Sequence, residues 1–262
     1  MGETAETASA RVASQLQNRA DWQRLLQSNV DAIRLSEFAN PYECQQLVTF
    51  VTQHPRAVQY STAAGIVRLG SSFSDARKSD ALAEEYSKPD ILTEALGVNS
   101  VISRILGTIT ASWPLGLETF RCNGVALHRS IARRIVGAGA EPHDDNVAKE
   151  LPGEHLASAV QIQLGLNLYI EMPEEGGELE GWHRRLSREE YDRLRNPDPK
   201  LHYGIRRDVL GVCDWRIEPK LGDLIIFQNN ELHAIRHSTG ARTTWGFFLG
   251  YRGQNESLLI WS

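Results

Sequence analysis

The first half of the chain shows the spacing of apolar residues that predicts amphipathic helices. Apolar side chains recur at helical intervals in a stretch that starts near residue 21: Trp22, Leu25, Leu26 and Val30. A second helix is predicted to begin at Asn40, because Pro41 and Glu43 follow in the order of a first-turn proline and a capping box. Two further helical stretches are expected over 79–87 and 90–113.

From residue 115 onward the pattern changes to short apolar runs separated by Pro, Gly, Asn and Asp, which predicts β-strands. Eight strands are expected, over 117–122, 126–136, 159–171, 178–182, 211–217, 223–227, 232–237 and 243–251. A polar insert over 184–210, with a short helix near 187–195, interrupts them. We interpret it as a surface excursion, and inserts of this length can also act as lids over a site.

Strands that follow a helical half favour an α+β, mainly β protein. The expected fold is a double-stranded β-helix (jelly roll, cupin-like) buttressed by N-terminal helices. We expect one domain over 19–262, with the helical half at about 19–114 and the jelly-roll core at about 115–262. Residues 1–18 are polar, and we expect them to be disordered.

The strand over 159–171 separates its side chains sharply by type. Its even positions are all aliphatic: Val160, Ile162, Leu164, Leu166, Leu168 and Ile170. Its odd positions include Gln163, Asn167 and Tyr169. Because successive strand residues point to opposite faces, one face is apolar and the other polar. The polar face either contacts water or lines an internal binding cavity, and the chemistry described next favours the cavity.

Composition and charge exclude several classes of protein. The 262 residues carry a net charge of −5 at a pI near 5.9, which argues against a nucleic-acid partner, because phosphate binding needs a basic surface. No apolar run reaches the ~18 residues of a membrane span. The three cysteines are far apart in the chain, which is typical of reduced thiols and of a cytoplasmic protein. We therefore expect neither a nucleic-acid nor a membrane partner.

A candidate metal motif lies at His143-Asp144-Asp145. On an extended backbone His143 and Asp145 point to the same side, whereas Asp144 points away. Two histidines and one carboxylate form the facial triad of non-haem iron sites, which leaves other metal positions open. Alone, the His-x-Asp spacing is expected about once by chance in a chain of this composition.

A downstream segment makes the motif specific. A Gly222-Asp223 turn leads into an apolar strand that ends at Phe227, His233 follows, and Arg242 comes nine residues later. Together with His-x-Asp, this order resembles the Fe(II)/2-oxoglutarate-dependent dioxygenases, in particular their free-standing small-molecule hydroxylases and halogenases. The chain departs from the family pattern in having five residues, instead of one, between Phe227 and His233.

The resemblance implies a set of site residues. Iron(II) would be held by His143, Asp145 and His233, and His237 is a weaker alternative because Arg242 would follow it too closely. Arg242 would bind the distal carboxylate of 2-oxoglutarate, because a planar guanidinium matches a carboxylate better than a lysine does. Further hydrogen bonds to 2-oxoglutarate are expected from Asn167, Tyr169 and Thr244. Candidate substrate contacts are Arg134, for an anionic group, and Trp182.

The implied reaction couples the oxidation of 2-oxoglutarate by O2, to succinate and CO2, with hydroxylation of an unactivated carbon in an amino-acid derivative or natural-product intermediate. Halogenases of this family typically carry Gly or Ala at the carboxylate position, so Asp145 favours hydroxylation. Desaturation, cyclisation and halogenation remain alternatives. A non-catalytic metal-binding jelly roll and an iron oxidase without 2-oxoglutarate are two others, but neither would require Arg242.

Overall fold

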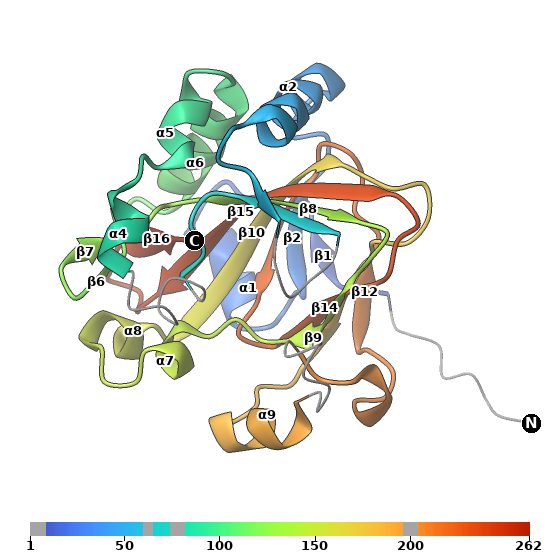
Figure 1. Ribbon diagram of the computed structural model, residues 1–262. Coiled ribbons are helices and arrows are strands. Elements are labelled where there is room, and N and C mark those ends of the chain that lie inside the picture. The colour runs from blue at the N-terminus through green and yellow to red at the C-terminus, as the bar shows by residue number, and fades with distance from the viewer. Residues whose placement is uncertain (1–8, 60–64, 74–81, 196–203) are drawn as a thin grey trace, which may run out of the picture.

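The computed structural model describes residues 9–59, 65–73, 82–195 and 204–262. They form two main β-sheets that lie face to face, with helices against the outer face of the larger sheet (Figure 1). The helices α2 (Pro41–Gln53), α5 (Ile91–Leu96) and α6 (Ser100–Ser112) lie above this sheet in Figure 1, and the smaller sheet lies below it. The expected jelly roll with buttressing helices is therefore confirmed.

Within the described ranges the larger sheet has ten strands, and it is built around the antiparallel pair β10 and β15. Its main path runs β1 (Val12–Ala13), β2 (Ala32–Leu35), β13 (Leu224–Gln228), β10 (Ile162–Glu171), β15 (Ala241–Tyr251), β8 (Ile131–Val136), β4 (Ile66–Leu69) and β3 (Val58–Gln59). Two more strands extend it from β15: β16 (Leu258–Trp261) and β5 (Leu117–Thr119).

In the part of the chain that the structure describes, the smaller sheet has four strands: β12 (Trp215–Ile217), β11 (Leu179–Trp182), β14 (Leu232–Ile235) and β9 (Ala140–His143). A two-stranded sheet pairs β6 (Arg121–Cys122) with β7 (Val125–Ala126). The remaining elements are α1 (Arg19–Leu26), α4 (Leu82–Ser87), α7 (Val147–Glu150), α8 (His155–Ala159), α9 (Arg188–Leu194) and the 3-10 helix η2 (Arg207–Val209).

The helix signals in the sequence proved accurate. In α2 the capping box is reciprocal: the Glu43 backbone N–H donates to Asn40 Oδ1, and the Asn40 backbone N–H donates to Glu43 Oε2, each at 2.9 Å. The helical stretch over 90–113 is divided into α5 and α6 by a C-cap at Gly97. Part of the stretch over 79–87 lies outside the described residues, and α4 forms its remainder.

The strand predictions need three corrections. The first 70 residues contribute β1 to β4 to the larger sheet, and β1 pairs with β2, so residues 9–18 are not all outside the fold. These strands of two to four residues are too short to show a clear alternation. The strand expected from residue 159 begins at Ile162 instead, because residues 155–159 form α8. Finally, β9 and β16 were not among the expected strands.

The main hydrophobic core lies between the helices and the outer face of the larger sheet. The aliphatic row of β10 enters it, with Leu164, Leu166 and Leu168 fully buried among side chains of α1, α2 and α6. The odd-numbered residues of β10 face the smaller sheet, where Tyr169 packs with Trp215 and Phe227. The polar face therefore lines the interior between the two sheets.

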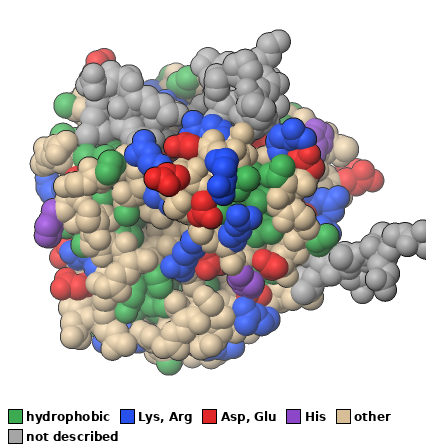
Figure 2. Space-filling model, turned by 90° about the horizontal axis from the view of Figure 1, so that it is seen from below, with side chains coloured by type: hydrophobic (Ala, Val, Ile, Leu, Met, Phe, Trp, Pro, Cys, Tyr) green, Lys and Arg blue, Asp and Glu red, His purple; other side chains and the backbone are tan. Residues whose placement is uncertain are grey.

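The outer side of the smaller sheet carries charges of both signs, as Figure 2 shows for the face seen from below. The buried carboxylate of Glu180 forms ion pairs with Arg207 and Arg216. Arg216 Nη2 lies 2.9 Å from Glu180 Oε1. Arg207 also donates to the Ile235 carbonyl oxygen at 3.0 Å, which fastens the end of the insert to β14. None of the helices in the described ranges has the length and hydropathy needed to cross a bilayer.

Candidate metal and cosubstrate site

Two neighbouring strands of the smaller sheet bring the triad together. His143 ends β9 and is directly paired with His233 of β14, and Asp145 follows two residues beyond β9. Asp145 Oδ2 lies 3.6 Å from His233 Nε2 and 4.0 Å from His143 Nε2. Among the described residues, these three form the one group of ligand-type side chains close enough to share a metal ion.

Backbone carbonyls fix the orientation of both imidazoles. The Nδ1 atom of His143 lies 2.7 Å from the Glu141 carbonyl oxygen, and that of His233 lies 3.0 Å from the Glu231 carbonyl oxygen. A carbonyl only accepts, so each Nδ1 carries the proton and the lone pair of each imidazole is on Nε2. Both lone pairs are on the nitrogens that face Asp145, as metal binding requires.

The protonation states agree with this arrangement. Burial, together with the charge of His233, lowers the pKa of His143 to about 4, so its imidazole is neutral near pH 7. Burial acts to raise the pKa of Asp145, but its neighbours His233, His143 and Arg133 together outweigh burial, so this pKa is lowered. The site thus offers neutral imidazole and ionised carboxylate, the forms that bind metals.

Asp145 is held by Asn229. The Asp145 backbone N–H donates to the Asn229 carbonyl oxygen at 2.8 Å, and the Asn229 side-chain amide donates to Asp145 Oδ2 at 3.3 Å. Asp144 points away and forms an ion pair with Lys149. Gly165 leaves room for Asn229, because a Cβ there would lie 3.3 Å from the Asn229 side chain. Asn229 was not predicted as a site residue, and the long spacing between Phe227 and His233 is the feature that could have indicated it.

Aromatic side chains support His233 from within the double sheet. The Phe227 ring lies 5.1 Å from the His233 ring, and Trp215 packs edge-on against Phe227 at 6.3 Å. Gly181 pairs with both His233 and Trp215. Its missing side chain is required, because a Cβ there would come within 2.0 Å of the Trp215 ring.

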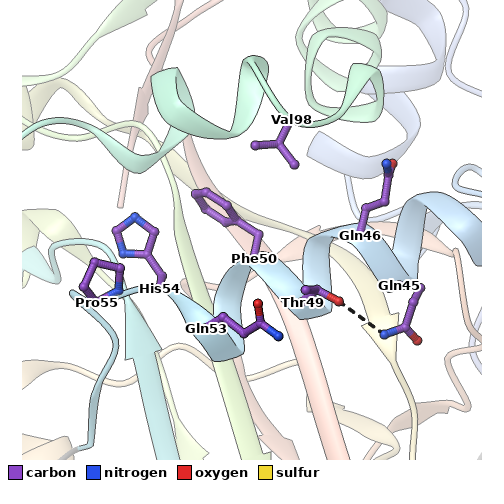
Figure 3. Close-up of a pocket in the computed structure, with 8 residues that line it drawn as sticks. All are labelled: Gln45, Gln46, Thr49, Phe50, Gln53, His54, Pro55 and Val98. Carbon is purple, nitrogen blue, oxygen red and sulfur yellow. Dashed lines mark hydrogen bonds between the residues drawn. The ribbon is translucent and has the colours of Figure 1, made fainter.

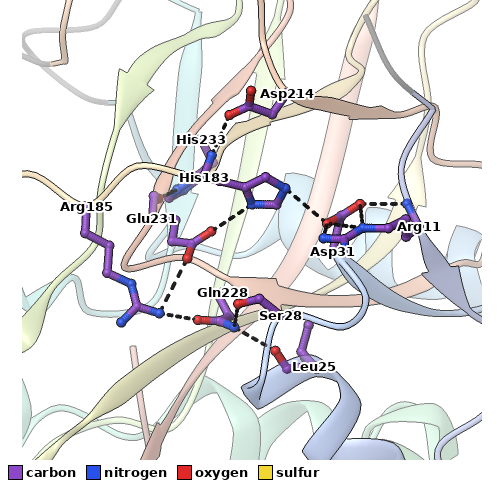
Figure 4. Close-up of polar contacts among 10 residues, drawn as sticks. All are labelled: Arg11, Leu25, Ser28, Asp31, His183, Arg185, Asp214, Gln228, Glu231 and His233. Atoms are coloured by element: carbon purple, nitrogen blue, oxygen red, sulfur yellow. Dashed lines mark hydrogen bonds and ion pairs between the residues drawn. The ribbon is translucent and has the colours of Figure 1, made fainter.

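A polar network outside the triad holds the loop between β13 and β14 (Figure 4). Gln228 donates to the Leu25 carbonyl oxygen at 2.6 Å, which ties the start of the loop to α1. At the other end, His183 lies between Glu231, at 3.4 Å, and the buried Asp31, at 3.3 Å. The network therefore anchors both the residue before Asn229 and the residue whose carbonyl orients His233.

The larger sheet supplies the candidate cosubstrate residues. Arg242 is only 3% exposed and lies 4.8 Å over the Tyr169 ring, and Thr244 is paired with Tyr169 across β15 and β10. Within the described ranges, no carboxylate lies within 4.0 Å of Arg242, and the Arg242 Nε and Tyr169 hydroxyl make no hydrogen bond. Burial also raises the pKa of the Tyr169 hydroxyl. A buried cation without a counter-ion is costly, so this cluster fits an anionic ligand.

The other candidate residues fall into two groups. Asn167 lies on the same face as Tyr169 and Thr244, over Gly246. Arg134 does not join the site, because its guanidinium forms two hydrogen bonds with Glu171, at 2.9 and 3.1 Å, on the opposite face of the sheet.

Trp182 and His237 are also placed away from the triad. Trp182 lies on the face of β11 opposite to Gly181 and packs under the insert with Leu232. His237 is exposed, and it does not belong to the ligand group.

The insert is anchored more firmly than its sequence suggested. Leu186 and Ile205 are buried against β11 and β14, and the Ile205 backbone N–H donates to the Pro142 carbonyl oxygen at 2.7 Å, beside His143. Tyr191 of α9 faces the metal motif: burial and the nearby Asp144 and Asp145 carboxylates raise the pKa of its hydroxyl. Tyr191 was not predicted as a site residue, because the polar insert carries no specific motif around it.

A groove of about 470 Å³ lies elsewhere, on the outer surface of α2 (Figure 3). It is lined by Gln45, Gln46, Thr49, Phe50, Gln53, His54, Pro55 and Val98. Its one imidazole, His54, is already bound to Glu94 at 2.9 Å. The groove contributes no residue to the triad or to the Arg242 cluster.

The donor set of the triad fits iron(II). Two imidazole nitrogens and one carboxylate oxygen suit a first-row metal of mixed N and O preference and leave other positions open. The ligand atoms lie within 4.8 Å of one another, and the histidine tautomers are already correct.

Comparisons with known proteins agree with this geometry. The sequence pattern of the carrier-protein-independent halogenase WelO5 matches residues 79–262. A search of curated proteins found no match. The structure is similar to an N-substituted L-amino acid dioxygenase from Burkholderia ambifaria, at 18% identity and a TM-score of 0.58, over 93% of this chain and 90% of that one. It is also similar to HygX from Streptomyces hygroscopicus, crystallised with nickel and 2-oxoglutarate, at 13% identity and a TM-score of 0.51, over 87% and 86% of the two chains. At these identities the two structures show a shared fold.

Proposed function

This chain belongs to the family of the carrier-protein-independent halogenase WelO5, and from that premise we propose that it hydroxylates an unactivated carbon of a small molecule rather than halogenating it. Membership confirms the resemblance to Fe(II)/2-oxoglutarate oxygenases. The enzyme uses Fe(II), 2-oxoglutarate and O2. One observation carries the choice of hydroxylation: Asp145 places its carboxylate within 4.0 Å of both histidine nitrogens, where a halogenase needs room for a halide.

Each residue of the site has a distinct role in this proposal. His143 and His233 present Nε2 to the metal, and Asp145 supplies the third ligand and the only negative charge. Arg242 binds the distal carboxylate of 2-oxoglutarate, with Tyr169 and Thr244 beside it and Asn167 further along β10. When bound, iron(II) and 2-oxoglutarate activate O2, with release of succinate and CO2. Because the ligands and Arg242 come from facing sheets, the double sheet sets their separation and limits the access of water.

Two measurements test the proposal. Anaerobic protein mixed with Fe(II) and 2-oxoglutarate should develop a visible metal-to-ligand charge-transfer band, and admission of O2 should yield succinate only when 2-oxoglutarate is present. Products from a panel of free and N-acylated amino acids and indole alkaloids, formed in chloride buffer, should gain one oxygen atom by mass spectrometry. A chlorinated product from the native enzyme would instead support halogenation.

A further inference from the structure

His183, which directly follows β11, lies between two carboxylates. Its Nε2 atom lies 3.3 Å from Asp31 Oδ1, and its Nδ1 atom lies 3.4 Å from Glu231 Oε2 (Figure 4). An ionised carboxylate only accepts hydrogen bonds, whereas a neutral imidazole carries a proton on just one of its two nitrogens. The protonated imidazole is therefore the form that can donate to both residues at once.

The surrounding charges also favour the protonated form. Within the described ranges, the charged groups that contact His183 or its two partners are three carboxylates and two guanidinium groups: Asp31, Glu231, Asp214, Arg11 and Arg185. Asp214 accepts the His183 backbone N–H at 2.7 Å. Both arginine side chains are half-exposed, whereas Asp31 is buried. With a neutral imidazole this set keeps one negative charge in excess, and protonation of His183 removes it.

The Glu231 end of this contact leads to the metal ligands. The backbone carbonyl oxygen of Glu231 lies 3.0 Å from His233 Nδ1, so it sets how His233 presents Nε2 to the metal. Two residues earlier on the same loop, Asn229 donates to Asp145 Oδ2 at 3.3 Å. One loop therefore orients two of the three ligands, and His183 holds the side chain of the residue that ends this loop.

We propose that His183 is a positioning residue for the metal site, and that its protonated form fixes Glu231 and, through Glu231, His233. The inference rests on the proposed function, because it takes the assigned triad as given and adds a pH-dependent control of the triad's metal affinity. Histidine changes its charge between about pH 5 and 8. The cation, and with it the better-ordered metal site, is present at the lower end of this range and is lost as the pH rises.

The test is cobalt(II) binding to the metal-free protein, followed by visible absorption at about pH 6 and about pH 8.5, on either side of the histidine titration. Protonation of the ligands weakens binding at the lower pH in every protein, so each variant is compared with the native protein at the same pH. His183→Gln should bind cobalt about tenfold less tightly than the native protein at the lower pH, and within about twofold at the higher pH. The control His237→Gln, which replaces an exposed histidine outside the triad, should match the native protein at both.

A second variant keeps the charge at every pH. His183→Arg has a permanent cation with donors for two carboxylates, so at about pH 8.5 it should bind cobalt about tenfold more tightly than the native protein. This comparison decides the matter if His183→Gln does not fold. A positive charge that acted on the metal ion alone would repel it, and His183→Gln would then bind cobalt more tightly than the native protein at the lower pH.

Several results would overturn the proposal. Equal or tighter cobalt binding by His183→Gln at the lower pH would do so, as would a weakening of the same size at both pH values, which would indicate a purely structural role. Equal binding by folded His183→Arg and the native protein at the higher pH is a third. Melting temperatures establish that each variant is folded. A native protein that bound no cobalt would overturn the triad, the proposed function and this inference together. The expected cobalt pattern in a protein that does not hydroxylate would count against the proposed function alone.

Discussion

Asn229 forms two hydrogen bonds with Asp145. The Asp145 backbone N–H donates to the Asn229 carbonyl oxygen at 2.8 Å, and the Asn229 side-chain amide donates to the Asp145 carboxylate at 3.3 Å. The two residues are 84 positions apart in the sequence and belong to different loops. Asn229 is 1% exposed and lies in the segment that is longer here than in the family pattern. The added residues thus place a hydrogen-bond donor directly on a candidate metal ligand.

We expect Asn229→Ala to weaken metal binding by about 10- to 100-fold, because loss of a partner that orients a ligand typically costs that much. Cobalt(II) titration of the apoprotein, followed by its visible absorption, measures the effect without turnover. Asn230→Ala is the matched control, since Asn230 is also buried on the same loop and has no hydrogen bond to Asp145 among those described. Equal weakening in both variants would show that the loop, and not the contact with Asp145, matters.

Asp145→Gly should reduce hydroxylation by on the order of 100-fold or more, because it removes one metal ligand and the charge that balances the metal. The vacated position should then admit chloride or azide, with weak transfer of the anion to the same substrate carbon. Asp144→Gly should retain most activity, because Asp144 is bound to Lys149 and not to the triad. Mass spectrometry of the products formed in chloride and azide buffers measures both activities. If Asp144→Gly were inactive while Asp145→Gly hydroxylated at the native rate, Asp145 would not be the metal ligand.

Arg242→Ala should weaken 2-oxoglutarate binding by about 2–4 kcal/mol, or roughly 30- to 1,000-fold in Kd, because a carboxylate is left unpaired in a buried site. Arg242→Lys should recover only part of this loss, since an ammonium group cannot form two parallel hydrogen bonds. Titration of the charge-transfer band with 2-oxoglutarate gives the affinity, and cobalt(II) binding should be unchanged in both variants. Native-like 2-oxoglutarate affinity in the alanine variant would contradict the assignment.

Hydrogen exchange should divide the insert into a fixed and a mobile part. The Ile205 amide should exchange slowly, because it is bonded to the Pro142 carbonyl oxygen beneath buried side chains. Amides of α9 should exchange quickly, because that helix has no fully buried residue, and they should slow when substrate binds if α9 closes over the site. Uniformly slow exchange in the free enzyme would exclude a mobile lid.

The pair between Glu171 and Arg134 should contribute a pH-dependent part of the stability. Burial acts to raise the pKa of Glu171, but hydrogen bonds from Arg134 and Thr243 lower it below its usual value of 4.5. A carboxylate with a lowered folded-state pKa stabilises the protein above about pH 4.5, and this contribution disappears as the pH falls through the lowered value. Glu171→Gln should therefore lower the melting temperature at pH 7 and have little effect near pH 3.

Local signals in the sequence predicted some features well and others poorly. The capping box of α2 and the divided faces of β10 depend on residues within one or two turns, so spacing alone identified them. The short strands β2 and β4 join the larger sheet by pairing with the distant strands β13 and β8, which no local pattern reveals. The same reasoning explains Asn229, whose role depends on contact with Asp145 across the fold.

Arg133 and Arg134 show that the residues of a strand cannot be assigned to its two faces until the register of the strand is known. Both residues lie in the predicted strand before the metal motif, and a shift of one residue exchanges inner and outer faces. Pairing with β15 places Arg133 inward beside Thr244 and Arg134 outward beside Thr243. Alternation along the strand predicts that Arg133 and Arg134 face opposite sides of the sheet. Only the pairing of β8 with β15 shows which of the two faces inward.

The division of the site between two sheets makes the distance from the triad to Arg242 a property of the packing between them. Ile225, Phe227 and Trp215 pack together in that space. Replacing one of these three residues with a larger or smaller one would change the distance between the two sheets. That distance sets how long a dicarboxylic acid must be to reach from the metal to the Arg242 guanidinium. Substitutions in this layer are therefore expected to alter the preference between 2-oxoglutarate and its shorter or longer homologues, although none of the three residues belongs to the metal-ligand group.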